Sequence, residues 1–583
     1  MTFPYPSGRA CLVATMLRRR SVITDPGGTQ TGHATYCKRM TAPAQPLDAP
    51  PVDLFSFHTQ LGGVTVLRPF ALALAALAGA AQLAPAGPAL AAPTTYYVDC
   101  SAATNGTGSL TSPINSMPAA NALTLAPGDA LLFKRGVTCK GQLYARFSGS
   151  VSAPVTYGRY GTGGAARIDA NGNYAAVWLK NASYVTVQDL ELIAPGDNTT
   201  ARRGVWAQAV DSGDLTGVVL QRLDIHDVRG TLPAKTGGAA ANGKYAGASG
   251  GIVVEALGST TPSAFKGMRI ADNDIHGVDR AGIYFWSNWC RRPDMVGFWT
   301  SLCTAAWHPH TGTVIQDNTL TDIGGDGLVV KTSSDALVQR NDLDEFNERA
   351  GSVNAGMWTA NSDWVTFQYN RSAHGNTTAD GQAYDVDHST NHITFQYNVS
   401  HDNAGGFFLL CPYGAGVPGQ SKDFVIRYNL SVNDHARTFQ VCAGGLVRGQ
   451  IYNNTVQLPD DSHHQIVTES DAKDNELDVA FTNNLLRGGS SPASAQWTLN
   501  DSSFRIDHNL LYQVPVPAAA TATVTSAPLL AAPSATSHDP AAFKLLPGSP
   551  ALGSGSPISG NGGRDYFGAP LASPPSIGFH EGP

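Results

Sequence analysis

The peptide TFQYN occurs twice in this chain, at residues 366–370 and 394–398, and VIRYN follows at residues 425–429. Each copy alternates apolar and polar residues and ends in asparagine. Related phrases recur on both sides, mostly at intervals of about 22 to 31 residues. A unit this short cannot enclose a core of its own. Nine phrases end in asparagine: Asn273, Asn318, Asn341, Asn370, Asn398, Asn429, Asn454, Asn484 and Asn509.

Two earlier copies, at residues 185–192 and 218–225, carry Leu190 and Leu223 in place of the asparagine. Short runs of alternating apolar residues, bounded by Gly, Asn, Asp and Ser, are typical of strands joined by turns. Helical spacing is nearly absent. Because a strand-rich unit of this size must stack on its neighbours to bury its apolar face, the repeat predicts an all-β parallel solenoid of about 11 or more coils.

The recurring asparagine is a polar residue beside the predicted core. At the same place in successive coils, an inward asparagine can bond to the asparagine of the next coil and to the backbone of the turn. We therefore expect a buried ladder of amides. Asn370, Asn398 and Asn429 also match the N-x-Ser glycosylation pattern, but an amide inside such a stack is not accessible as an acceptor.

The repeats resemble the right-handed parallel β-helix proteins of the pectate-lyase-like superfamily. The segments TTYYVDCSAATNGTGSLTSPINSM (94–117) and LAPGDALLFKRG (125–136) are similar to the first coil of many secreted members. FKLLPGSPALGSG (543–555) is similar to the closing segment of many bacterial members. The resemblance covers about residues 94–582 and implies a right-handed parallel β-helix. It leaves the activity open, because this fold includes lyases, hydrolases, phage tailspikes and adhesins.

Composition and the N-terminal region point to an exported protein. With 62 Gly, 14% charged residues and a formal charge of −7, the chain carries no polybasic patch for nucleic acid or membrane surfaces. The apolar run at residues 69–92 is broken by Gly and Pro and ends in Ala89-Leu90-Ala91, as in a signal peptide, which we assign to residues 64–91. The interruptions argue against a membrane span.

These features define the expected organisation. Residues 1–63 form a doubtful leader without an apolar core, and we expect translation to begin near Val64, although a genuine cytoplasmic leader is the alternative. Residues 92–512 are assigned to the β-helix, and residues 513–583 to an Ala/Pro-rich crossing and a closing cap. We expect a monomer that is secreted, periplasmic or displayed at the cell surface, with a polysaccharide as its partner.

Cysteine usage agrees with export. Outside the doubtful leader six cysteines remain, and an even count in an exported chain suggests disulfides. Cys411 and Cys442 have the same spacing as the repeat asparagines Asn398 and Asn429, and stacked coils lie about 4.8 Å apart, within the reach of a disulfide. No CxxC motif or His/Cys cluster indicates zinc. The predicted pairs are Cys100–Cys139, Cys290–Cys303 and Cys411–Cys442.

An aromatic insertion interrupts the repeat between Asn273 and Asn318. Four of the nine tryptophans lie in its segment 285–310, which also holds Cys290 and Cys303. Because aromatic faces stack on sugar rings and long loops on rigid scaffolds often bind ligands, we predict that Trp286 and Trp289 bind substrate. The alternative is a small core that folds over the side of the solenoid. The four tryptophans are Trp286, Trp289, Trp299 and Trp307.

The candidate chemistry lies on three successive coils, in GGDGLVVK (324–331), NERAGSVNAGMW (347–358) and DGQAYDVDHS (380–389). Asp385 and Asp387 alternate along one strand, so they share a face at roughly 6.5 to 7 Å, near the boundary between retaining and inverting carboxylate spacings. The candidate catalytic residues are Asp385, Asp387, Asp326, Lys331 and His388. The candidate substrate-binding residues, besides Trp286 and Trp289, are Trp358, Arg349 and Asp380.

The register of this strand is ambiguous. Strict alignment with the neighbouring coils would turn Asp385 and Asp387 into the core, where unpaired carboxylates are costly. A one-residue adjustment in the turn HSTNH (388–392) would instead place Tyr384 and Val386 inside and both acids outside. We favour the outward arrangement.

Three functions remain open. A hydrolase would use Asp385 and Asp387, or Asp326, as general acid and as base or nucleophile. A lyase would hold Ca²⁺ on the carboxylates and use Lys331 or Arg349 as the base. A non-catalytic glycan-binding or adhesive rod would carry the acids as a solvated face. Gly-His-Gly and Arg-Ile-Lys motifs are absent, which argues against a polygalacturonase-like hydrolase. We favour carbohydrate cleavage, with hydrolysis slightly ahead of elimination. No cofactor is assigned, and Ca²⁺ is considered only for the lyase.

Overall fold

The computed structural model describes most of the chain from residue 92 onwards. The doubtful leader, the predicted signal peptide and Trp299 lie outside the described residues. These residues are 92–232, 246–293, 303, 305–351, 353–412, 420–461, 463–469, 473–489 and 495–583.

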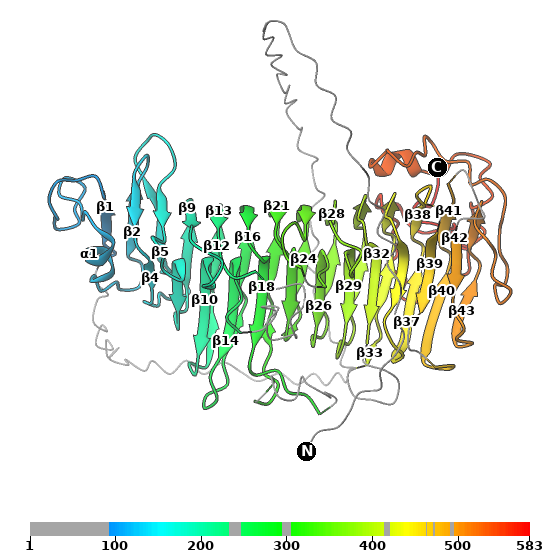
Figure 1. Ribbon diagram of the computed structural model, residues 1–583, viewed down its shortest axis with the longest axis horizontal. Helices are drawn as coiled ribbons and strands as arrows, with labels where there is room; N and C mark the ends of the chain where they lie inside the picture. Colours follow the sequence, from blue (N-terminus) through cyan, green and yellow to red (C-terminus); the bar gives the residue numbers. More distant parts are fainter. Residues whose placement is uncertain are drawn as a thin grey trace, which may run out of the picture. The chain divides into compact units, whose positions relative to one another are not determined.

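Three long sheets, in which every strand pairing is parallel, form the body of the molecule (Figure 1). Sheet 1 contains 15 strands, sheet 2 contains 13 and sheet 3 contains 12. A fourth sheet contains four short strands, each of which comes between a strand of sheet 3 and a strand of sheet 1 along the chain.

Sheet 1 consists of β1 (Thr95–Val98), β2 (Ala130–Lys134), β5 (Val155–Tyr160), β8 (Val185–Gln188), β12 (Val219–Gln221), β16 (Arg269–Ala271), β20 (Val314–Gln316), β24 (Leu337–Gln339), β27 (Thr366–Gln368), β30 (Thr394–Gln396), β33 (Ser421–Lys422), β34 (Val425–Arg427), β37 (Leu446–Tyr452), β40 (Leu477–Thr482) and β43 (Phe504–Asp507). Sheet 2 consists of β3 (Thr138–Lys140), β6 (Arg167–Asp169), β9 (Glu191–Ala194), β13 (Asp224–Val228), β17 (Asp274–Val278), β21 (Thr319–Ile323), β25 (Asp342–Phe346), β28 (Arg371–Ala373), β31 (Val399–His401), β35 (Leu430–Val432), β38 (Thr455–Gln457), β41 (Leu485–Arg487) and β44 (Leu510–Tyr512).

Sheet 3 consists of β4 (Leu143–Ala145), β7 (Ala175–Lys180), β10 (Arg203–Val210), β14 (Gly250–Leu257), β18 (Ala281–Ser287), β22 (Leu328–Lys331), β26 (Met357–Ala360), β29 (Gln382–Asp387), β32 (Gly406–Cys411), β36 (Arg437–Val441), β39 (His464–Glu469) and β42 (Ala495–Thr498). The fourth sheet consists of β11 (Asp214–Thr216), β15 (Ala264–Lys266), β19 (His310–Thr311) and β23 (Ser333–Ser334). Two short helical segments are α1 (Met117–Asn121) and the 3₁₀ turn Pro540–Phe543.

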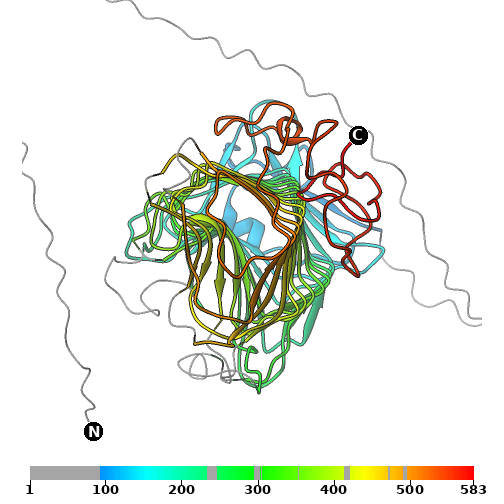
Figure 2. The same cartoon turned by 90° about the vertical axis from the view of Figure 1, so that its right-hand side faces the viewer.

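Most coils contribute one strand to each long sheet, in the order sheet 3, sheet 1, sheet 2. The strands β7, β8 and β9 form one such coil, and β10 starts the next one. Seen end-on, successive coils superimpose into a single tube (Figure 2). The predicted parallel β-helix is therefore confirmed. Among the described residues, no helix is long and apolar enough to cross a membrane.

The repeated asparagine forms the expected ladder at the turn from sheet 1 to sheet 2. The Nδ2 of Asn370 donates to Oδ1 of Asn398 at 3.0 Å, and Nδ2 of Asn398 donates to Oδ1 of Asn429 at 3.0 Å. The same amides reach backbone carbonyls, such as that of Phe367 at 3.0 Å from Asn398 Nδ2. Because all of these groups are buried, the ladder satisfies polar atoms that have no access to water. The pattern runs through all nine asparagines, from Asn273 to Asn509.

Glycines make the corner at the start of sheet 3 possible. A Cβ on Gly251 would lie 2.5 Å from Cγ2 of Ile275 and 2.8 Å from the carbonyl oxygen of Gly282. The chain therefore passes too close to sheet 2 and to the next coil for any side chain. The same crowding surrounds Gly204, Gly282, Gly327 and Gly356.

The three predicted disulfides are present. Their Cα atoms lie 5.3 Å apart in Cys100–Cys139, 4.9 Å in Cys290–Cys303 and 4.8 Å in Cys411–Cys442. The last pair links the ends of neighbouring strands of sheet 3, as expected from its spacing. These bonds agree with an oxidising, extracellular environment.

The C-terminal segment covers the outer face of sheet 2 in the last coils, outside the tube (Figure 2). Phe543, Leu545 and Phe579 pack with Leu430 and Leu485 in a second apolar core. Polar contacts reinforce it: Asn453 Nδ2 donates to the carbonyls of Ser576 and Gly578, both at 2.8 Å. The segment therefore closes over apolar surface that the coils leave on sheet 2.

Candidate functional site

The acids of β29 face away from the core of the solenoid. Tyr384 pairs with Met357 and Asp385 with Trp358, so Tyr384 and Val386 join the buried core. Further along, Asp363 is opposite Asn391, which places the extra residue in the turn after β29. The predicted outward register, including the position of its adjustment, is confirmed.

Asp385 and Asp387 both lie on the outer face of sheet 3, next to different residues of the neighbouring coils. Asp385 lies between Trp358 and Leu409 and is only 5% exposed. Asp387 is half-buried opposite Cys411, and its Oδ1 accepts the backbone N–H of His388 at 2.7 Å. The two carboxylates therefore differ in their access to solvent although they share one strand.

Lys331, the last residue of β22, projects from the outer face of sheet 3 into a group of aromatic rings. Its Nζ lies 4.7 Å from the ring centre of Trp358, 5.5 Å from that of Tyr284 and 5.7 Å from that of Trp286. The side chain is 3% exposed. Cation–π attraction to three rings compensates part of the cost of burying this ammonium group.

Asp326 is held by a buried ion pair. Its carboxylate lies 2.9 Å from Arg280 and accepts hydrogen bonds from the Ala355 N–H at 3.1 Å and Trp358 Nε1 at 3.0 Å. Arg280 also donates to Oδ1 of Asn354 at 2.9 Å. The Asp326 side chain is fully buried. These contacts suit a group that fixes the start of β26 better than one that reaches substrate, and its predicted catalytic role stays a prediction.

His388 lies beside a small enclosed cavity. Burial holds the pKa of His388 well below its usual value, and the positive charges of Lys331 and Arg292 act in the same direction. The imidazole is therefore neutral at pH 7. The cavity is lined by Trp286, Cys290, Cys303, Lys331, Thr332, Ala360, Asn361 and His388.

The aromatic insertion forms a small core on the outside of sheet 3. Trp286 and Trp289 are 3% and 5% exposed, and Trp289 Nε1 donates to the Leu257 carbonyl at 3.3 Å. Trp286 packs with Tyr284 and the Cys290–Cys303 disulfide. Both indoles are buried, as expected for the alternative of a small core, and their predicted binding of substrate stays a prediction.

Arg349 is not brought to the carboxylates of β29. Its guanidinium lies 2.9 Å from Asp279 and donates to the Val278 carbonyl at 2.8 Å, and it also pairs with Asp322. All three partners belong to sheet 2 or its end. Asp380 is half-buried just before β29, where its backbone forms a β-bridge with Asn354.

Sequence reasoning missed Glu255 on the same outer face. This residue is fully buried, and its Oε2 accepts hydrogen bonds from Trp206 Nε1 at 2.6 Å and Gln208 Nε2 at 3.0 Å. Trp178 stacks on Trp206 at 4.9 Å. The alternating run GGIVVEAL (250–257) contains the signal, because its acid falls on the outward side.

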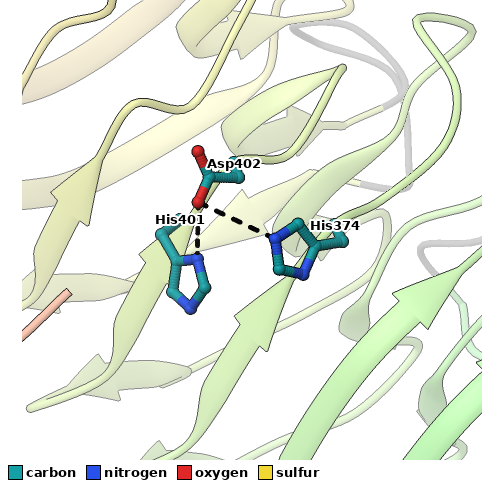
Figure 3. A group of neighbouring side chains, drawn as sticks. All are labelled: His374, His401 and Asp402. Atoms are coloured by element: carbon teal, nitrogen blue, oxygen red, sulfur yellow. Dashed lines mark hydrogen bonds and ion pairs between the residues drawn. The ribbon is translucent and has the colours of Figure 1, made fainter. Parts of the chain in front are cut away.

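Two histidine–carboxylate clusters on sheet 2 could hold a metal ion. In the first, His374 and His401 converge on one oxygen of Asp402, at 3.8 and 2.9 Å (Figure 3). Arg371 lies 2.9 Å from the other ring nitrogen of His401, and the positive charge of this guanidinium disfavours binding of a metal cation at the same site. The other cluster is Glu191, Asp224 and His226, where Arg167 lies 2.5 Å from Glu191. An arginine therefore lies in direct contact with each cluster.

His226 and His276 lie within strands β13 and β17 of sheet 2. They pair across β13 and β17 and stack at 4.9 Å. They border an open cleft of about 540 Å³ lined also by Asp227, Arg229 and Asp322.

Comparison with known proteins supports the fold. No family model matches the sequence, and the search of curated proteins found no match. Among solved structures, a GH136 lacto-N-biosidase from Eubacterium ramulus is similar with a TM-score of 0.51 and 23% identity, over 70% of this chain and 67% of that one. XylC in complex with xylose is similar with a TM-score of 0.48 and 11% identity, over 84% of this chain and 98% of that one. At 23% identity, the likeness to the lacto-N-biosidase concerns the fold alone.

Proposed function

We propose that this protein is an exported carbohydrate-active enzyme that cleaves glycosidic bonds of a polysaccharide on the outer face of sheet 3. The observation that carries the proposal is the outward pair Asp385 and Asp387 on β29, beside the aromatic and cationic surface of Trp358 and Lys331. Paired carboxylates are the usual catalytic groups of glycoside hydrolysis. The likeness in fold to a lacto-N-biosidase is in line with this chemistry.

In the proposed mechanism the two acids have different roles. Burial disfavours the charged form of a carboxyl group, so we assign proton donation to the leaving oxygen to the more buried Asp385. The more accessible Asp387 acts on the anomeric carbon, directly or through water. The His388 N–H holds Asp387 Oδ1 in place.

Hydrolysis has more support than elimination. A lyase needs a base next to the uronate, but Lys331 is enclosed by three rings and Arg349 is engaged with Asp279 and Asp322. Lys331 lies beside the β29 carboxylates but is only 3% exposed, and Arg349 is held by acids of sheet 2. We therefore place general acid catalysis ahead of calcium-assisted elimination.

The test is incubation of the protein, from residue 92 onwards, with a panel of neutral and acidic polysaccharides, with and without chelator. New reducing ends without absorbance from an unsaturated uronate are expected, and chelator should not stop their release. Unsaturated products that disappear with chelator would instead establish elimination. The variants Asp385→Asn and Asp387→Asn should each lose at least about a thousandfold in turnover. Full activity in both would refute the assignment of these residues.

A further inference from the structure

In eight successive coils, one residue of the turn from sheet 3 to sheet 1 adopts the left-handed conformation. Its N–H donates to a carbonyl of the next coil: Trp364 to Asn391 and His392 to Lys422, both at 3.0 Å. This hydrogen bond fixes the turn and places the residues of successive coils in one row. The row contains Tyr184, Gly217, Gly267, Gly312, Asp335, Trp364, His392 and Asp423.

Trp364 is a costly residue in this row. Its φ is 56°, a region that suits the glycines of the earlier coils but strains a bulky side chain. Its side chain is also 55% exposed, so the indole gives up much of the free energy that burial would supply. Since neither property helps folding, the residue points to a function at this position.

The indole is held flat by its neighbour. Its ring stacks on that of His392 from the next coil, with centroids 3.7 Å apart and planes at 18°. In the preceding coil the row holds Asp335, a short and exposed side chain. Trp364 therefore has one face supported by an imidazole and the other directed toward a coil with a small polar residue.

The stacked pair lies just beyond the candidate catalytic strand. His392 follows Asp387 by five residues, which limits the separation of their Cα atoms to about 18 Å. The adjacent Asp363 pairs with Arg292 of the aromatic insertion at 2.9 Å, so polar groups flank the rings. Rings beside carboxylates form the usual arrangement for a sugar, with the ring faces packing on C–H groups and the acids accepting hydroxyl hydrogens.

We propose that Trp364, supported by His392, is a sugar-stacking platform that binds a ring of the polysaccharide a few units away from the bond to be cleaved. The platform rests on the proposed function and specifies it, because it requires a substrate longer than the catalytic carboxylates alone would contact. Asp335 and Asp363 accept hydrogen bonds from the hydroxyl groups of the same sugar.

The test uses Trp364→Gly, a change that the row tolerates elsewhere, and Trp364→Phe, which keeps a stacking face. Tyr369→Gly is the matched control: Tyr369 is also exposed, with a φ of 55°, and stacks on Tyr397 at 5.0 Å, but it lies at the turn between sheets 1 and 2. Binding is measured by affinity electrophoresis in gels that contain xylan, galactan, arabinan, polygalacturonate or alginate. The Asp385→Asn variant is included so that binding is observed without cleavage.

The wild type, Asp385→Asn and Tyr369→Gly are expected to be retarded by the same polysaccharide, with Trp364→Gly about tenfold weaker and Trp364→Phe in between. With a cleaved polysaccharide, Trp364→Gly should raise KM by the same factor and leave kcat unchanged. Equal retardation of Trp364→Gly and wild type would overturn the platform, and so would a lack of retardation of wild type in every gel. Retardation that depends on Trp364, without any release of reducing ends or unsaturated products, would instead refute the proposed function and keep the platform.

Discussion

At the scale of single residues, the buried carboxylates of Asp326 and Asp385, on nearby coils, have different roles. Asp326 neutralises Arg280, which is itself only 1% exposed, whereas Asp385 is directed toward the outer surface beside Trp358. Removing the charge of Asp326 leaves a buried cation without its counterion. Removing that of Asp385 changes the proposed chemistry.

We therefore expect Asp326→Asn to lower the free energy of unfolding by about 3–5 kcal/mol. Asp385→Asn should change it by less than about 1 kcal/mol while it removes turnover. Urea unfolding monitored by circular dichroism, together with rate measurements on both variants, checks the distinction. Equal losses of stability would show that Asp385 is also a structural acid.

The asparagine ladder gives a second prediction at this scale. Asn398 Oδ1 accepts from both the N–H and Nδ2 of Asn370, each at 3.0 Å. Asn398→Ala leaves these two buried donors of Asn370 without their acceptor, so a loss of about 3 kcal/mol is expected. Gln396→Ala is the control, because Gln396 forms a similar bond to Gln368 on the half-exposed outer face of sheet 1. Its loss should stay below about 1 kcal/mol in the same unfolding experiment.

At the scale of elements, buried histidines make sheet 3 and its neighbours sensitive to acid. Burial lowers the pKa of His464 and of His401 to about 4, and that of His310 to about 3. Burial raises the pKa of Asp434 to about 6, so protonation of Asp434 as the pH falls favours the folded state and opposes the effect of the histidines. A folded-state pKa below that of the unfolded chain means that the unfolded chain binds more protons at intermediate pH.

The stability contributed by these histidines is present above about pH 6.5 and decreases as the pH falls toward 4. Each should account for on the order of 2 kcal/mol between pH 7 and pH 5, partly offset by protonation of Asp434. Melting temperatures measured by calorimetry should therefore decrease as the pH is lowered from 7 to 5. The His464→Gln variant should show a smaller decrease than wild type, and an unchanged slope would refute the role of His464.

Particular elements show what could be predicted. The ladder and the Cys411–Cys442 disulfide followed from spacing, because a solenoid repeats its geometry with every coil. The outward register of β29 followed instead from the cost of burying its carboxylates in the core. The insertion after β18 did not, because the same tryptophans suit a sugar platform or a small core, and only tertiary contacts decide between them. Arg349 was misplaced for a related reason: its partners Asp279 and Asp322 lie on earlier coils and carry no signal near Arg349. Trp364 was detectable in SDWVTFQYN, where a tryptophan takes a turn position that Gly or Asp fills in most coils of the row.

At the scale of the whole molecule, the C-terminal segment protects an apolar sheet face. Leu430, Leu485 and Leu510 on sheet 2 pack against Phe543 and Phe579. Truncation after Tyr512 would expose this face as a large continuous apolar patch. We expect the truncated protein to retain strand structure by circular dichroism but to associate, as measured by size-exclusion chromatography with light scattering. A monodisperse, monomeric product would contradict this role.

The amide ladder also has a direction, since each side chain donates toward the following coil from Asn273 to Asn509. A whole coil that is inserted between two such asparagines would meet the same hydrogen-bond donor and acceptor on either side, and a deletion of one coil would bring the same donor and acceptor together. The architecture can thus gain or lose length in evolution by tandem duplication or excision of single repeats, without any redesign of the remaining turns.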